Sequence, residues 1–347
     1  MKKHLVALVA VVAVLVGSLP VMAAEKTLNL YIWSEYMPDE VLADFTKETG
    51  IKVKISTYDS NETLYAKIKM LGGKGYDLIV PSAEYVSRMA GEGLLATIDK
   101  NRLPNLANLD ENFRNLPYDP DGAHSVPYMW GTTGIAVNTA MVPAGQVTGY
   151  ADLWNPALAG KLLLPDDMRT TFGMALKVLG YSTNDTDPAH IEQAFLRAKS
   201  LYPAVKVFDS DSPKQALLNG EVAVAVLWNG EAYVTNAEND AIVYVYPKEG
   251  ANRWVDNLCI PKNAANVENA HAFINYLLDP KVAARISQEM GYATPNKAAM
   301  ALLPAEVRDN QIIYPPADKL KGSEFETDLG QAQRLYDQYW TKLKTGR

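Results

Sequence analysis

Residues 27–81 read TLNLYIWSEYMPDEVLADFTKETGIKVKISTYDSNETLYAKIKMLGGKGYDLIVP and alternate between two kinds of hydrophobic pattern. Three segments show the alternation or the continuous apolar run of strands, and two show the spacing of amphipathic helices. In chain order these segments are residues 27–32, 39–50, 51–58, 61–70 and 76–81. The β-α-β-α-β order predicts an α/β fold with a parallel sheet that helices cover on both faces.

The first 24 residues have the pattern of an export signal. Lys2 and Lys3 precede an apolar run from Leu5 to Val16, which is short for a membrane span. Small residues follow, so we expect cleavage after Ala23 or Ala24. An uncleaved membrane anchor is the alternative. Cleavage would leave about 323 residues, too many for one small core.

A second series of strands and helices begins near residue 132. Strand patterns cover residues 134–138, 161–165, 222–227, 241–246 and 257–261, and helical patterns cover residues 166–179, 191–201, 211–219 and 267–278. We therefore expect two lobes with a ligand cleft between them. Their predicted extents are residues 25–133 plus 256–302 for the first and residues 134–255 plus 303–347 for the second. The strands near 132–138 and 254–260 are the candidate crossings between lobes.

Charge and cysteine content limit the possible partners. The whole chain has a net charge of −7, and without the signal lysines it has 31 basic and 40 acidic residues, a net charge of −9. This balance argues against a nucleic-acid partner. Cys259 is the only cysteine, so no intrachain disulfide can form, and its apolar neighbours predict a buried thiol.

No constellation of reactive residues points to an enzyme. The histidines, His4, His124, His190 and His271, are scattered, which makes a histidine-based metal site improbable. The Gly-x-Ser-x-Gly and Gly-x-x-x-x-Gly-Lys-Ser/Thr motifs are missing from the sequence. Residues 72–75, GGKG, precede a strand and read as a tight turn. We expect no catalysis, no metal and no cofactor.

Aromatic and acidic residues occur together where strands are predicted to end. Trp33 lies beside Glu35 and Tyr36, Trp228 three residues before Glu231, and Trp254 two before Asp256. Ligands bind beyond the carboxyl ends of parallel strands, and we expect residues 33–36 and 82–85 to be loops there. Carboxylates neutralise a buried ammonium group, and indole faces attract it. The pattern favours a linear amine, although each pair alone also fits a rim residue or a turn cap.

Several longer motifs, distributed over essentially the whole chain after the signal, carry a family resemblance. They are residues 31–36 (YIWSEY), 76–82 (YDLIVPS), 227–230 (LWNG), 246–250 (YPKEG), 291–296 (GYATPN) and 342–347 (KLKTGR). Together they resemble the bacterial periplasmic spermidine/putrescine-binding proteins. The resemblance implies a two-lobed, type II periplasmic binding protein fold and a periplasmic location. It also implies a polyamine ligand, delivery to the membrane permease of an ABC importer, and a monomeric protein.

The resemblance also implies which residues contact the ligand. By motif matching these are Trp33, Ser34, Glu35, Tyr36, Ser82, Tyr85, Asp167, Ser210, Trp228, Glu231, Trp254, Asp256, Tyr292 and Glu326. Thr170, Glu231 and Glu326 depart from the spermidine-preferring pattern, which has a glutamate, a small polar residue and a glutamine there. We therefore hypothesise that Glu231 favours a diamine. Two other roles stay open: a periplasmic amine sensor that reports to a membrane receptor, and an exported enzyme acting on amines.

Overall fold

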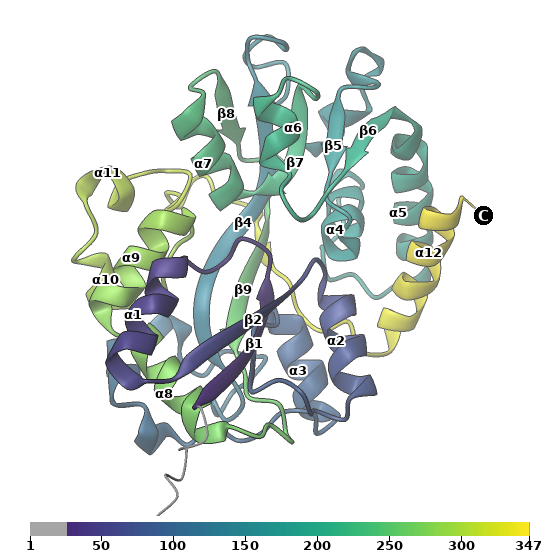
Figure 1. Ribbon diagram of the computed structural model, residues 1–347. Coiled ribbons are helices and arrows are strands. Elements are labelled where there is room, and N and C mark those ends of the chain that lie inside the picture. The colour runs from purple at the N-terminus through teal and green to yellow at the C-terminus, as the bar shows by residue number, and fades with distance from the viewer. Residues whose placement is uncertain (1–25, 347) are drawn as a thin grey trace, which may run out of the picture.

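The computed structural model describes residues 26–346, which form two α/β lobes, each built around its own sheet (Figure 1). The predicted export signal, residues 1–24, lies outside the described residues. Across residues 26–346 no helix combines the length and the apolar character that crossing a bilayer requires.

The first lobe contains the parallel sheet that residues 27–81 predict. Its strands, in the order β2-β1-β3, are β1 (Thr27–Trp33), β2 (Lys52–Tyr58) and β3 (Leu78–Ile79). Both pairings of β1 are parallel, which confirms the prediction. β3 is shorter than its apolar run suggests. Ile79 also bridges Cys259, so the far side of β3 pairs with a distant segment of the chain.

Three helices follow the strands of the first lobe: α1 (Asp39–Thr49), α2 (Asn61–Met70) and α3 (Ala83–Gly91). The first two agree with the predicted segments. The third corrects the expectation of a loop at residues 82–85, because α3 begins immediately after Ser82. Its residues Ala83, Val86 and Met89, three apart in sequence, are all buried, and this shared apolar face makes the segment helical.

The second lobe is built on a larger mixed sheet. Its strands lie in the order β10-β9-β4-β7-β5-β6, and β8 also pairs with β4. Their bounds are β4 (Val126–Asn138), β5 (Leu162–Leu164), β6 (Val205–Phe208), β7 (Val224–Trp228), β8 (Ile242–Val245), β9 (Asn252–Leu258) and β10 (Glu324–Phe325). β4 runs antiparallel to β7, β8 and β9, whereas β5 is parallel to β6 and β7.

Two long strands of this sheet run through both lobes, side by side. β4 and β9 pair from Val126↔Leu258 to Thr133↔Asn252. The chain just beyond β9 continues into the first lobe, where Cys259 bridges Ile79, while the far half of β4 pairs with β7. Figure 1 shows β4 and β9 rising together through the middle of the molecule. β4 starts earlier than its pattern suggests, because proline and glycine interrupt its hydrophobic alternation. β9 also starts before the predicted segment 257–261, and it ends at Leu258.

The remaining helices cover the sheets and close the second lobe. They are α4 (Met168–Val178), α5 (Pro188–Leu201), α6 (Lys214–Leu218), α7 (Asn229–Glu238), α8 (Val267–Leu277), α9 (Pro280–Met290), α10 (Lys297–Met300), α11 (Ala305–Arg308) and α12 (Gln333–Thr345). The chain ends in the second lobe, where α12 lies beside α5 (Figure 1). Tyr336 of α12 is fully buried and packs edge-to-face on Phe172, 5.1 Å between ring centroids.

Each lobe has its own apolar core. Cys259 belongs to the core between the first sheet and α2 and α3, and it is fully buried, as its neighbours in the sequence predict. Burial raises the pKa of its thiol well above the usual value. The thiol is therefore poorly suited to react.

Candidate functional site

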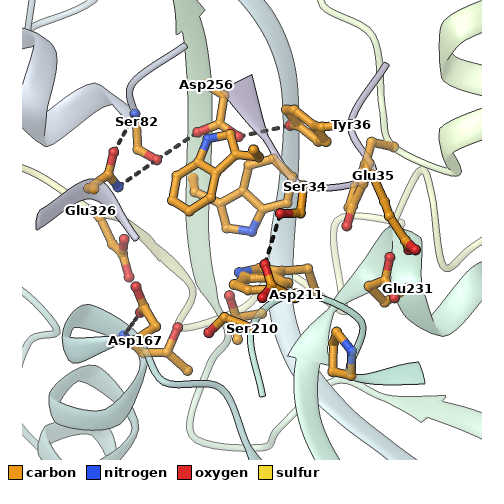
Figure 2. A pocket seen from close by; sticks show the side chains of 18 of the residues that line it. Ser34, Glu35, Tyr36, Ser82, Asp167, Ser210, Asp211, Glu231, Asp256 and Glu326 are labelled. Atoms are coloured by element: carbon orange, nitrogen blue, oxygen red, sulfur yellow. Dashed lines mark hydrogen bonds between the residues drawn. The ribbon is translucent and has the colours of Figure 1, made fainter. Parts of the chain in front are cut away.

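A cleft of about 700 Å³, including the part open to solvent, is lined by residues of both lobes (Figure 2). Its lining residues are Trp33, Ser34, Glu35, Tyr36, Asn61, Ser82, Glu84, Thr133, Asp167, Thr170, Ser210, Asp211, Pro213, Trp228, Glu231, Trp254, Asp256, Tyr292 and Glu326. Thirteen of the fourteen predicted contact residues are among them. Seven lining residues are acidic, and none of the described residues that line the cleft is Lys, Arg or His.

Tyr85 is the predicted residue that the structure does not bring to the cleft. Its side chain is 2% exposed, lies in the core of the first lobe and donates a 3.1 Å hydrogen bond to Glu62. The reason is the helix that begins after Ser82. In the first turn of that helix Glu84 faces the cleft, while Tyr85 packs against α2.

Two side-chain hydrogen bonds hold the carboxylate of Asp256 at the cleft. It lies on β9 and is 6% exposed. The hydroxyl of Ser82 donates to Oδ1 at 2.6 Å and the phenol of Tyr36 to Oδ2 at 2.8 Å (Figure 2). Burial nevertheless raises the pKa of Asp256 to about 7, because the loss of hydration outweighs these two hydrogen bonds to the charged form.

A second group of carboxylates, Glu84, Asp167 and Glu326, lines one side of the cleft. Asp167 caps α4, where its side chain accepts a 2.6 Å hydrogen bond from the amide of Thr170. Burial raises the pKa of all three, that of Glu84 to about 7 and that of Glu326 well above its usual value. The charge of the buried Arg169 opposes this rise in each case. Burial therefore favours the protonated form of these groups, and Glu84 titrates near neutral pH in the ligand-free protein.

Interlocked aromatic rings form the wall beside Asp256. Tyr292 packs edge-to-face on both Tyr36 and Trp254, with ring centroids 5.3 Å apart in each pair. Gly230 makes room for this packing, since a Cβ there would lie 2.4 Å from the ring of Tyr292. Gly131 does the same for Trp254, at 2.4 Å from its indole. The wall is therefore closely packed and presents mainly ring faces and edges.

On the side of the cleft away from Asp167 and Glu326, a network of ion pairs connects the two lobes (Figure 2). The ammonium of Lys214, at the start of α6, contacts Glu35 of the first lobe and lies 3.2 Å from Glu231 of α7. Burial raises the pKa of Glu231 although Lys214 opposes the rise. Next to this network, the hydroxyl of Ser34 donates a 2.8 Å hydrogen bond to Asp211 (Figure 2).

Two polar acceptors of the cleft wall have no partner among residues 26–346. They are Oε2 of Glu84 and Oγ of Ser210, both inaccessible to solvent. Buried polar atoms are nearly always hydrogen-bonded, so such atoms in a binding cleft indicate groups that a ligand can satisfy. A donor-rich ligand fits both atoms, because each can accept a hydrogen bond from an N–H group.

Six lining residues were not among the predicted contacts: Asn61, Glu84, Thr133, Thr170, Asp211 and Pro213, of which Thr170 was named only as a departure from the family pattern. Asn61 and Glu84 could have been found, because each stands in the first helical turn after a strand of the parallel sheet, at the edge where ligands bind. Asn61 donates to the hydroxyl of Ser82 at 3.0 Å and thereby supports the residue that holds Asp256. No local signal marks the others.

Over residues 40–314 the chain matches the family described as "Bacterial extracellular solute-binding protein". It belongs to this family. The "Spermidine/putrescine-binding periplasmic protein" of Escherichia coli (strain K12) is 48% identical to this solute-binding protein over 322 residues, which cover 93% of this chain and 92% of the relative. The "Putrescine-binding periplasmic protein PotF" of the same organism is 38% identical over 369 residues, covering 100% of this chain and 99% of the relative.

Solved structures agree with the fold of this solute-binding protein. One from Listeria monocytogenes is 40% identical, has a TM-score of 0.89, and is matched over 93% of this chain and 100% of its own. The "Spermidine/Putrescine ABC Transporter Substrate-Binding Protein PotD" from Streptococcus pneumoniae is 36% identical, with a TM-score of 0.75 and coverage of 92% and 99%. The resemblance seen in the sequence motifs and the two-lobed α/β fold that it implied are both confirmed.

Proposed function

We propose that this protein captures a polyamine, putrescine or spermidine, in the periplasm and delivers it to the membrane permease of an ABC importer. One observation carries the proposal: seven acidic residues and a packed aromatic wall line a single cleft that has no basic residue among its described lining. Relatives at 48% and 38% identity, named for spermidine and putrescine binding, support the same ligand class.

The chemistry of the cleft suits a linear amine. Each ammonium group of the ligand can replace its hydration with carboxylate oxygens, and Asp256 and Glu84 offer these in a buried setting. The methylene segments between ammonium groups can lie along the rings of Tyr292 and Trp254, which also attract cations by about 0.5–2 kcal/mol per contact. Binding would draw protons off the carboxyl groups, since a nearby cation lowers their pKa.

Capture would proceed by closure of one lobe on the other. We assign residues 25–133 plus 256–302 to the first lobe and residues 134–255 plus 303–347 to the second. The hydrogen-bonded strands β4 and β9 join the lobes and support this division. An amine that contacts both lobes binds the closed form more tightly and so shifts the population toward it. The permease would then recognise the closed form of a monomer.

The other roles have less support. The relatives and solved structures quoted above carry the names of binding proteins and transporters, not of sensors, so a sensor has no support from them. The family is one of solute-binding proteins, which favours capture without chemical change. The acidic balance of the chain argues against nucleic acid as a ligand. We propose cleavage of the signal after Ala23 or Ala24, consistent with the periplasmic names of the relatives.

A thermal-shift panel tests the proposal directly. The purified protein is heated with putrescine, cadaverine, norspermidine, spermidine or spermine, and with glucose and glutamate as controls. A ligand present at 100 times its dissociation constant stabilises the folded state by about 2.7 kcal/mol, so the bound amine is expected to raise the melting temperature clearly. No shift with any of the five amines would overturn the proposed function.

A further inference from the structure

Lys214 is a cation that contacts two acids of the ligand cleft without being one of the lining residues. Its ammonium contacts the carboxylate of Glu35 and lies 3.2 Å from Oε2 and 3.5 Å from Oε1 of Glu231. Both of these acids line the cleft. The side chain of Lys214 is 13% exposed and that of Glu231 11% exposed, so the pair is largely removed from solvent.

The contact between Lys214 and Glu35 connects the two lobes. Glu35 stands in the loop after β1 of the first lobe, in a left-handed backbone conformation (φ 49°) that aims its side chain differently from an extended residue. Lys214 and Glu231 stand at the starts of α6 and α7 in the second lobe. Holding a non-glycine residue in this conformation is costly unless contacts favour it, and the ion pair with Lys214 is such a contact.

The acids of the cleft form two groups with different partners. Figure 2 shows Glu35 and Glu231 on one side and Asp167 and Glu326 on the other. The first group contacts the ammonium of Lys214 directly, whereas the second group is influenced by the charge of Arg169. Among the described residues the guanidinium of Arg169 donates its hydrogen bonds to Thr327 and Asn184 and not to these carboxylates. The two acids of the first group therefore already contact one positive charge, which stands beside the cleft.

We propose that Lys214 is a specificity-determining residue, a built-in ammonium group that fills the Glu35–Glu231 side of the cleft and selects shorter amines. The inference rests on the proposed function. A triamine long enough to span the cleft would bring its additional ammonium beside Lys214, where like charges repel. A diamine can bind through the other acids and leave the Lys214 network intact. Preference for a diamine then arises from this cation, and Glu231 acts by holding it in place.

Calorimetric titration of four variants with putrescine and spermidine tests the inference. In Lys214→Gln the side chain keeps its polar end and loses its charge, so Glu35 and Glu231 become available to the ligand. We expect the ratio of the putrescine to the spermidine dissociation constant to rise at least tenfold. Lys214→Arg keeps the charge and is expected to keep the wild-type ratio. The double variant Lys214→Gln, Glu231→Gln removes both charges. We expect its ratio of dissociation constants to return most of the way to the wild-type ratio.

Lys206→Gln is the matched control, because Lys206 is exposed on β6 and, within residues 26–346, bonds only the carbonyl of Glu221. It makes the same change in net charge away from the cleft, so both affinities should stay as in the wild type. If Lys214→Gln changes the dissociation constants of both amines by the same factor, the residue only holds the lobes together, and the inference is overturned. An unchanged ratio also overturns it. If the wild type binds neither amine, the proposed function fails and the inference fails with it.

Discussion

The phenol of Tyr36 donates a 2.8 Å hydrogen bond to the carboxylate of Asp256, and this contact joins the loop after β1 to strand β9. The two residues are 220 positions apart in the chain. Because β9 also pairs with β4 across both lobes, the carboxylate is fixed to the part of the molecule where the lobes meet. A ligand ammonium bound to Asp256 would therefore lie beside the paired strands β4 and β9 that join the lobes.

Replacing Asp256 by Asn should weaken amine binding by at least about 2 kcal/mol, roughly thirtyfold, since it removes one partner of a buried charge pair. Isothermal titration with putrescine and spermidine measures the loss. Asp240→Asn changes an exposed acid outside the cleft and should leave the affinity as it is. Equal affinity of wild type and Asp256→Asn would remove Asp256 from the ligand site.

Affinity for amines should rise with pH and level off above about pH 8. Burial raises the pKa of Asp256 and of Glu84 to about 7, so at pH 5.5 the free protein carries protons that a cation must displace. For each proton that the ligand displaces, the affinity falls by up to tenfold for every pH unit below the pKa of about 7. Titrations at pH 5.5, 6.5, 7.5 and 8.5 check the slope. An affinity independent of pH over this range would contradict the assignment of these carboxyl groups to the site.

The folding stability of the ligand-free protein should depend on pH in the opposite direction, because the contribution of Asp256 decreases as the pH rises. A carboxyl whose folded pKa lies above its unfolded value contributes stability that is complete below the unfolded value and is lost as pH rises through the folded value. Asp256 shifts from 3.8 to about 7, so its contribution disappears between about pH 4 and pH 7. Asp256→Asn should therefore melt at a higher temperature than the wild type at pH 8, and the difference should shrink toward pH 5. A constant difference at both pH values would argue against a raised pKa.

Gly230→Ala tests the aromatic wall without touching a charge. The added Cβ would lie 2.4 Å from the ring of Tyr292, so the ring must move away from its place beside Trp254. Overpacking of this kind costs about 1–3 kcal/mol, and we expect lower stability together with weaker amine binding. Gly91→Ala, in α3 with nothing within 4 Å of the new Cβ, should be neutral or slightly stabilising. Unchanged affinity in Gly230→Ala would show that Tyr292 is not needed where it stands.

The sequence predicted the first lobe best, because its signals are local. The alternation at residues 51–58 and the apolar run at residues 76–81 both belong to parallel strands, and their order determines the sheet. β4 was predicted only in its second half, since Pro127 and the glycines Gly131 and Gly134 hide its first half. Those glycines are required by distant partners, Trp254 and Tyr244, that a local pattern cannot reveal.

In the site, the sequence predicted residues whose type and local neighbours indicate ligand binding. It did not predict contacts between segments that are distant in the chain. Tryptophan beside an acid marked Trp33, Trp228 and Trp254 correctly as lining residues. Tyr85 was misplaced because the start of α3 was taken for a loop. The pairing of Glu231 with Lys214 could not be foreseen, because a lysine in a polar segment reads as an exposed charge until the fold brings the two together.

The buried thiol of Cys259 makes the closure of the lobes measurable by fluorescence. With its only cysteine fully enclosed, the protein can carry dyes solely at cysteines introduced elsewhere. Met70, 72% exposed on α2, and Leu196, 56% exposed on α5, stand on different lobes, and their exposure makes them suitable positions for a cysteine. With a donor dye and an acceptor dye at these two positions, single-molecule energy transfer would report the distance between the lobes for each amine and for each Lys214 variant.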